Sequence, residues 1–114
     1  MAGLHAGQEL LRTSAAPTAF LCASDALALG VCAAVRQQGL IVGQDVSVVG
    51  LGNTESGQLA HPALCSIQHD ILLPGQHIAK HLLALLGGTP PAQLQTLLTA
   101  QLIERKSLAQ APAT

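Results

Sequence analysis

Apolar positions along this chain follow two spacings, one typical of helices and one typical of short buried strands. Helical spacing, with apolar residues three and four apart, marks three segments. Compact apolar runs of strand length, rich in Val, Ile and Leu, mark four others. The predicted helices are 2–13, 24–38 and 70–86. The predicted strands are 19–22, 46–49, 64–67 and 97–104.

The second predicted helix has the clearest boundaries. Ser24 is a good N-cap residue, and Asp25 lies in the first turn, where the helix dipole favours a negative charge. Gly39 follows the polar end of the helix and suits the C′ position. The segment between them is apolar nearly all round, so we expect it to be buried on two sides.

Alternation of helices and strands favours an α/β fold with a mainly parallel sheet flanked by helices. The segment 50–62, rich in Gly, Asn, Thr and Ser, is predicted to be a loop. In the third helix, one face carries apolar residues and the other is polar. The apolar face consists of Ile71, Ile78, Leu82 and Leu86.

Composition excludes several function classes. A chain that is 49% hydrophobic and only 10% charged resembles a globular domain rather than a disordered segment. The net charge is -1 and the five Lys and Arg residues are scattered, so this chain by itself should bind neither DNA nor an anionic membrane. The apolar stretch 19–35 contains Asp25, which argues against a membrane span.

Cysteines and the N-terminus indicate a cytoplasmic protein. Three cysteines, an odd number without a CxxC pair, favour buried thiols in a reducing compartment over a disulfide or a metal site. The N-terminus has no basic region followed by an apolar run, so we expect no signal peptide.

Catalytic and metal-binding patterns are weak. The sequence contains no GxSxG, P-loop or GxGxxG motif, so we expect neither an enzyme nor a cofactor. His77 and His81 are four residues apart and could hold zinc with a third ligand, for which His61 and His69 are candidates only in principle. Gln76 and Lys80 share that face, which favours a solvated surface and no metal.

Four ordered segments resemble the LacI/GalR family of transcriptional repressors. Residues 17–30, PTAFLCASDALALG, are similar to the family segment PTA…ND…ALG. Gly39-Leu40 followed by DVSVVG at 45–50 resembles GL…P.DVSVVGFDD, and HPALCSI at 61–67 resembles PPLTTI. LIERKS at 102–107 resembles the closing strand LVxRxS. The register holds from about residue 3 to residue 112.

This resemblance implies a periplasmic-binding-protein-like (type I) sensor domain, in which a small effector, usually a sugar or nucleobase, lies between two α/β subdomains. Residues 1–114 would be the C-terminal part of that domain, and they lack the helix-turn-helix headpiece. The resemblance further implies a homodimer in the full-length protein. Operator DNA would be bound only through the missing headpiece.

Four residues are candidates for effector binding on this resemblance. Asp25 matches a carboxylate that binds sugar hydroxyl groups, and it follows a predicted strand, where ligands gather in α/β folds. Ser24 stands where the family usually has Asn, and its hydroxyl is expected to cap the helix rather than to touch ligand. His69 matches a Gln that lines the cleft. Ile71 stands where one member has an aromatic that packs on the effector, and an aliphatic chain offers no stacking face.

For each candidate there is a plain structural alternative, such as a helix-start carboxylate for Asp25 or local packing for His69 and Ile71. Leu51-Gly52-Asn53 replaces an aromatic and two acids, which weakens inferences about dimer contacts. Two other functions also remain open. One is a periplasmic-type sugar-binding module, and the other is a truncated remnant without function.

Overall fold

A computed structural model of the chain describes residues 1–69 and 72–111. These residues form two compact units, each of which is described by itself. One unit comprises Met1–Gln68 together with the segment from Leu102 onward, and the other lies between His69 and Gln101. We call them the sheet unit and the α4 unit.

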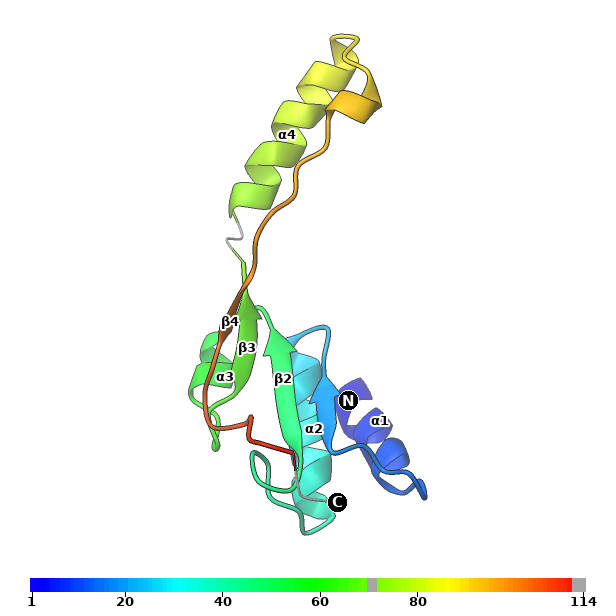
Figure 1. The fold of residues 1–114 in the computed structure, drawn as a ribbon, viewed down its shortest axis with the longest axis vertical. Helices are drawn as coiled ribbons and strands as arrows, with labels where there is room; N and C mark the ends of the chain where they lie inside the picture. Colours follow the sequence, from blue (N-terminus) through cyan, green and yellow to red (C-terminus); the bar gives the residue numbers. More distant parts are fainter. Residues whose placement is uncertain (70–71, 112–114) are drawn as a thin grey trace. The chain divides into compact units, whose positions relative to one another are not determined.

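The sheet unit is built on a four-stranded sheet in the order β1-β2-β3-β4 (Figure 1). Strand β1 (Ala19–Leu21) pairs in parallel with β2 (Ser47–Leu51), and β2 pairs in parallel with β3 (Cys65–Gln68). The sheet confirms the predicted α/β class with mainly parallel strands.

Strand β4 is shorter than predicted. It spans Gln101–Ile103, whereas the sequence predicted a strand over 97–104. Leu97 is 95% exposed and lies outside the strand, so its apolar character does not indicate burial in this sheet. After β4 the chain runs antiparallel to the β3 segment. Two hydrogen bonds show this direction: Arg105 N–H donates to Cys65 Sγ (2.9 Å), and Ser107 N–H donates to the Ala63 carbonyl (3.1 Å).

Helices α1 (Ala2–Leu11) and α2 (Asp25–Gln37) pack closely against each other. A side chain at Gly3 would place Cβ only 2.2 Å from the Leu27 carbonyl oxygen, and one at Gly30 would place it 2.7 Å from the Leu4 nitrogen. The absence of side chains at both glycines allows the two backbones to approach. Helix α2 also contacts β2, so its predicted burial on two sides is confirmed.

The C-terminal end of α2 is a Schellman motif. Gly39 has φ +75°, its N–H donates to the Arg36 carbonyl (3.0 Å), and the Leu40 N–H donates to the Val35 carbonyl (3.1 Å). This confirms Gly39 as the C′ residue. Leu40 also packs against the core that contains Val35, which is the apolar contact that usually accompanies this motif.

One face of the sheet carries the hydrophobic core. Val48 of β2 and Leu64 before β3 are fully buried and pack with the buried face of α2, and Phe20 of β1 packs partly against them. The α2 residues in this cluster are Ala28, Val31, Cys32 and Val35. Burial of these side chains against one another is the main stabilising contribution in the sheet unit.

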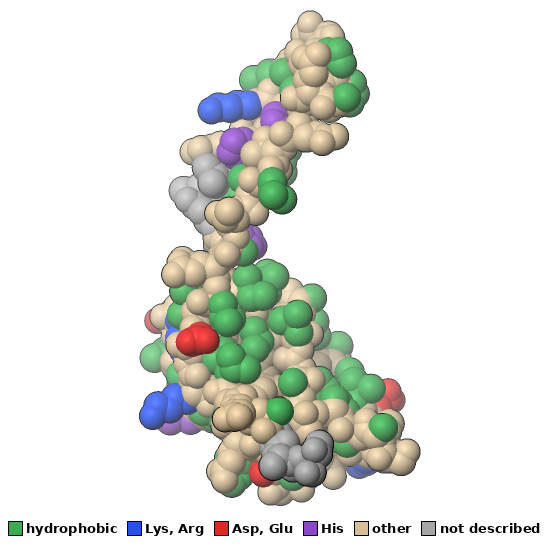
Figure 2. Space-filling view, viewed as in Figure 1, with side chains coloured by type: hydrophobic (Ala, Val, Ile, Leu, Met, Phe, Trp, Pro, Cys, Tyr) green, Lys and Arg blue, Asp and Glu red, His purple; other side chains and the backbone are tan. Residues whose placement is uncertain are grey.

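The other face of the sheet is only partly covered by the described residues. Side chains alternate between the two faces, so the paired residues Leu21 and Val49 share this face with Leu51 and its partner Ile67. Leu21 is 75% exposed, and the other three are half-buried. Figure 2 shows hydrophobic side chains gathered over this unit. Parallel sheets are normally covered on both faces, so this surface is unusual for the fold.

A one-turn helix, α3 (Glu55–Gln58), lies within the segment that the sequence predicted to be a loop. Its N-cap is Thr54, whose hydroxyl accepts a hydrogen bond from the Gly57 N–H (3.3 Å). The loop prediction was therefore wrong for these four residues. A helix of one turn has too few apolar positions to give a periodic pattern.

The α4 unit contains α4 (Leu72–Leu86) and a short 3₁₀ helix, η1 (Pro91–Gln93). The predicted helix is confirmed over these residues, and Ile71 lies outside the described part of the chain. Ile78, Leu82 and Leu86 of the predicted apolar face are 67%, 54% and 78% exposed. The apolar face of α4 is therefore not buried by the other residues of the α4 unit.

Candidate functional site

The candidate site of the sheet unit lies at the carboxyl ends of its parallel strands. Strands β1, β2 and β3 point the same way, so the residues that follow each of them meet at one edge of the sheet (Figure 1). Ser24 follows β1, Asn53 follows β2, and Gln68 ends β3. Ligands of open α/β sheets bind outside this edge. We call these residues and their hydrogen-bond partners the carboxyl edge.

Ser24 caps helix α2, as the sequence predicted. Its backbone is extended (φ −158°, ψ 158°), and its hydroxyl oxygen accepts a hydrogen bond from the Leu27 N–H at 3.2 Å. The side chain is half-buried. Because the hydroxyl accepts the bond from the helix, its hydrogen remains available to donate to another group.

Asp25 is buried, with only 1% of its surface exposed. Its Oδ2 accepts hydrogen bonds from the Thr54 N–H (2.7 Å) and the Thr54 hydroxyl (2.9 Å), and its Oδ1 accepts one from the Ser66 hydroxyl (2.6 Å). Hydrogen bonds to a carboxylate are stronger than neutral ones, and they compensate the loss of hydration. The carboxylate therefore joins the start of α2 to the segment after β2 and to β3.

Two glycines make room for this carboxylate. A Cβ at Gly50 would lie 2.2 Å from Asp25 Oδ1, and a Cβ at Gly57 would lie 2.9 Å from Asp25 Oδ2. Neither glycine has a positive φ, so the close approach of Asp25, rather than backbone conformation, explains why a side chain is excluded. Gly50 in β2 and Gly57 in α3 thus form two walls of the pocket that Asp25 fills.

Asn53 links several parts of the carboxyl edge and was not singled out as a site residue from the sequence. Its φ is +49°, which Asn tolerates better than most residues. Its backbone N–H donates to Ser66 Oγ (2.9 Å), and its Nδ2 donates to Gln68 Oε1 (2.9 Å). Its Oδ1 accepts from Arg105 Nη2 at 2.6 Å. The sequence signal was the Gly-Asn pair after a strand, which suits a turn with positive φ.

Arg105 supports the same edge from the chain segment after β4. Besides Asn53, its guanidinium donates through Nη1 to the Leu64 carbonyl at 2.8 Å. Nearby, the buried Ser107 hydroxyl donates to the Val48 carbonyl and accepts from the Cys65 N–H (2.8 Å). These bonds fasten the C-terminal segment between β2 and β3. From the sequence, Arg105 was only one of five scattered Lys and Arg residues, with no predicted role.

All three cysteines are free thiols. Cys32 and Cys65 are buried and Cys22 is half-buried, so the expected burial is confirmed for two of them. Burial raises the pKa of the Cys32 thiol to about 11 and also raises the pKa of Cys22. A thiol with a raised pKa is a poor nucleophile and a poor metal ligand.

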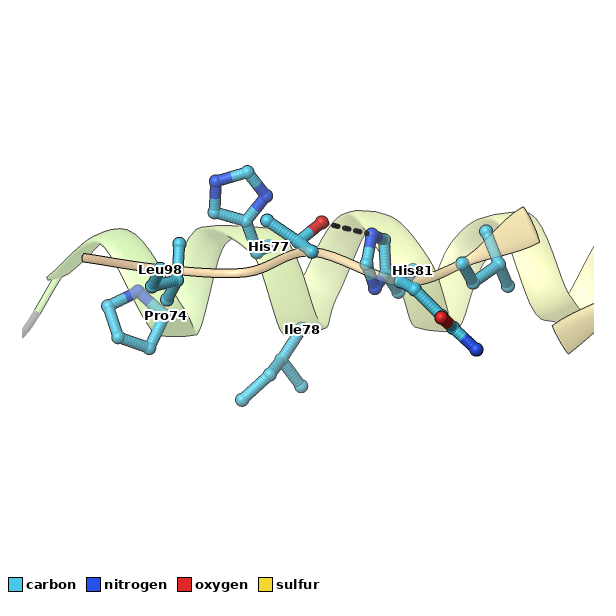
Figure 3. A pocket seen from close by; sticks show the side chains of 8 residues that line it. Pro74, His77, Ile78, His81 and Leu98 are labelled. Atoms are coloured by element: carbon cyan, nitrogen blue, oxygen red, sulfur yellow. Dashed lines mark hydrogen bonds between the residues drawn. The ribbon is translucent and has the colours of Figure 1, made fainter. Parts of the chain in front are cut away.

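His77 and His81 lie in the α4 unit, where they border a hollow of about 410 Å³ (Figure 3). Their rings meet edge to face, with centroids 6.2 Å apart. His81 Nε2 also forms a hydrogen bond with Thr96 Oγ1 at 3.1 Å. Within residues 1–69 and 72–111, no three His, Cys, Asp or Glu side chains come together in a way that could hold a metal ion.

The structure thus brings two of the four predicted effector residues together. Ser24 and Asp25 are neighbours at the carboxyl edge, where Ser24 caps α2 and Asp25 is buried. His69 is exposed and belongs to the α4 unit. Ile71 lies outside the described residues. The direct contact of Asp25 with an effector stays a prediction, and the hydrogen bonds that Asp25 makes within the protein are the finding.

Comparison with known proteins identifies related domains. Residues 2–108 match the family described as periplasmic binding protein-like domain. The chain is 38% identical over 107 residues to the lactose operon repressor of Escherichia coli (strain K12), covering 94% of this chain and 29% of the relative. The chain therefore spans less than a third of that protein's length.

Solved structures show the same likeness. The lac repressor dimer bound to operator and the anti-inducer ONPF superposes with a TM-score of 0.79 at 36% identity, covering 96% of this chain and 38% of that one. A LacI family transcriptional regulator from Arthrobacter sp. FB24, in complex with lactose, gives 0.75 at 29% identity, covering 93% of this chain and 40% of that one. These relatives are transcriptional regulators rather than enzymes, as the sequence led us to expect. Among the described residues, no helix is long and apolar enough to cross a membrane.

Proposed function

We propose a function from the premise that this chain belongs to the periplasmic binding protein-like domain family, as LacI-type repressors do. The chain, over residues 1–114, forms the C-terminal part of an effector-binding domain. Its carboxyl edge contributes to a site for a small, neutral, hydroxyl-rich effector, a sugar. Occupancy of that site would control operator binding by a headpiece that lies outside this sequence.

The observation that carries this proposal is the set of polar groups at the carboxyl ends of β1, β2 and β3. A hydroxyl (Ser24) and two mutually hydrogen-bonded carboxamides (Asn53 and Gln68) lie along the edge where α/β sheets bind ligands. These groups donate and accept hydrogen bonds without carrying charge, which suits sugar hydroxyl groups. A related regulator has been solved in complex with lactose, which supports the same ligand class.

Of the four residues that the resemblance suggests for effector binding, we propose that Ser24, His69 and Ile71 contact the effector directly. Ser24 retains a hydroxyl hydrogen for donation. His69 follows β3 directly and offers a polar ring, and Ile71 would fill space without a stacking face. Asp25 contributes to the site through its bonds to Thr54 and Ser66, since its own surface is buried.

Partners and location follow from the same premise. Since one lac repressor structure is a dimer bound to operator, we propose that the full-length protein is a homodimer that binds operator DNA through its headpiece. Such a regulator works in the cytoplasm. The net charge of -1 supports the view that this segment itself does not contact DNA.

A thermal melt followed by circular dichroism tests the sugar proposal. The ligands are lactose, galactose, ribose and, as a contrasting class, the nucleobase hypoxanthine. A sugar present at ten times its Kd should stabilise the chain by about 1.4 kcal/mol, which raises Tm by roughly 5 °C. Stabilisation by hypoxanthine alone would point to a nucleobase effector, and no shift with any sugar at 50 times the protein concentration or more would argue against the proposal.

One observation favours a second hypothesis, in which this chain has no function by itself. Several large apolar side chains of the α4 unit remain exposed, among them Leu83 at 71% and Leu86 at 78%. Exposed apolar surface of this kind promotes aggregation. Non-cooperative melting of the chain, without a baseline for the folded state, would support this hypothesis, whereas a single cooperative transition would count against it.

A further inference from the structure

We infer that Asp25 is a positioning residue for the carboxyl edge. Its carboxylate fastens the turn formed by Gly52, Asn53 and Thr54 to β3, and it thereby determines how the side chains of Asn53 and Gln68 are presented to a ligand. The inference rests on the proposed function only in taking that ligand to be the effector.

Asp25 is too deeply buried to contact a ligand, unlike the two carboxamides at the carboxyl edge. The side chain is 1% exposed, and both of its oxygens already accept hydrogen bonds. The donors come from distant parts of the sequence, because Thr54 lies 29 residues away and Ser66 lies 41 residues away. Gly50 and Gly57 close around the carboxylate, so any movement of Asp25 toward a ligand would open this packing.

The carboxylate also sets the direction of two hydroxyl groups. An ionised carboxylate can only accept hydrogen bonds, so the hydroxyl hydrogens of Thr54 and Ser66 must both point toward Asp25. Their oxygen lone pairs are then free to accept the Gly57 N–H (3.3 Å) and the Asn53 N–H (2.9 Å), respectively. A single buried charge thereby orients the bonds that hold the turn and the start of α3.

This orientation matters because the turn carries Asn53. With its N–H held by Ser66, Asn53 adopts φ +49°. That backbone conformation places its carboxamide between Gln68 Oε1 and Arg105 Nη2. If the turn were released, the Asn53 and Gln68 side chains would lose their mutual alignment at the edge of the sheet.

Amide hydrogen exchange of the 114-residue chain, measured by NMR, tests the inference. The test variant is Thr54→Val, which keeps the shape but removes the hydroxyl, and the matched control is Thr54→Ser, which keeps the hydroxyl. In Thr54→Val the Asn53 amide should exchange on the order of 10- to 100-fold faster than in the wild type, since the bonds to a charged acceptor act together. The Thr54→Ser protein should stay within about 3-fold of the wild type at the Asn53 amide.

The Asn53 amide is the informative probe because its hydrogen-bond partner is the Ser66 hydroxyl and not the Thr54 hydroxyl. Faster exchange at Gly57 alone would overturn the inference, because Gly57 bonds directly to the Thr54 hydroxyl. An equal acceleration of the Val48 and Val49 amides in β2 would also overturn it, since the effect would then be global loss of stability.

Asp25→Asn provides the second test. The Asn side chain has one acceptor oxygen and one NH₂ donor, so it can accept hydrogen bonds from Thr54 or from Ser66 but not from both, and the paired orientation of the two hydroxyls is lost. We expect the NH₂ signals of the Asn53 side chain to lose their separate wild-type positions, and unchanged signals would contradict the inference. Addition of lactose to the wild type is a separate arm. Absence of any lactose-induced shift would count against the sugar proposal, while the exchange data would still decide the role of Asp25.

Discussion

Substitution of Gly50 by Ala probes the packing around the buried carboxylate most sharply. The added Cβ would lie 2.2 Å from Asp25 Oδ1, 3.1 Å from Asp25 Cα and 3.1 Å from a Leu64 methyl carbon. The oxygen cannot turn away freely, because Ser66 and Thr54 hold the carboxylate. The Asp25 backbone cannot retreat easily either, because it forms the first turn of α2.

The expected loss of stability combines two contributions. Overpacking one methyl group into a rigid site costs about 1–3 kcal/mol. Displacement of the carboxylate also weakens at least one hydrogen bond to a charged group, which contributes about 1.5–3 kcal/mol. The free energy of unfolding should therefore fall by about 2.5–6 kcal/mol, a large part of the 5–15 kcal/mol that stabilises a domain of ordinary size.

Urea denaturation measures this loss, with the folded-state NMR signal of Val48 as the probe of the sheet unit. The midpoint should fall by about 2 M, given the usual dependence on urea for small proteins. Gly75→Ala in α4 is the matched control, because its Cβ would meet no atom within 4 Å. It should leave the Val48 transition unchanged. A Gly50→Ala protein within about 0.5 kcal/mol of the wild type would refute the close packing around Asp25.

Three further predictions concern the ends of α2 and its buried thiol. Ser24→Ala should lower the free energy of unfolding by about 1 kcal/mol through loss of the N-cap, whereas Ser24→Thr should retain most of it, as urea denaturation would show. Gly39→Ala should be destabilising by about 1 kcal/mol because of the φ of +75°, and an unchanged midpoint would contradict the assigned Schellman motif. The pKa of Cys32 is raised from 9.0 to about 11, so the folded state holds its proton longer than the unfolded state does. The stability that this thiol contributes should therefore be complete below pH 9 and decline as the pH rises toward 11, and Cys32→Ala should remove that decline.

The larger elements were predictable because periodic apolar positions reflect burial directly. The caps at Ser24 and Gly39 also follow from local chemistry, since each depends on backbone groups a few residues away. The pattern was a poorer guide at residues 97–100, which were predicted to be strand but lie outside β4, and at α4, whose apolar face is exposed. In both cases the pattern indicates that a segment can be buried, but not what covers it.

The arrangement around Asp25 could not be read from the sequence. Its position after a strand indicated a carboxylate at a helix start, but burial depends on Thr54 and Ser66, which are brought near by the pairing of β2 with β3. The role of Asn53 depends in the same way on Gln68 and Arg105. Such long-range hydrogen bonds leave no periodic trace along the chain.

The most direct test of the account is an NMR titration of the ¹⁵N-labelled chain with the sugar that raises its Tm most. Chemical shift changes map the ligand site even when binding is weak. We predict that the amides of Ser24, Asn53, Thr54 and Gln68 shift together and saturate with one Kd, while those of α1 do not move. Saturable shifts confined to the hollow beside His77 and His81, or to the exposed face of α4, would contradict a sugar site at the carboxyl edge.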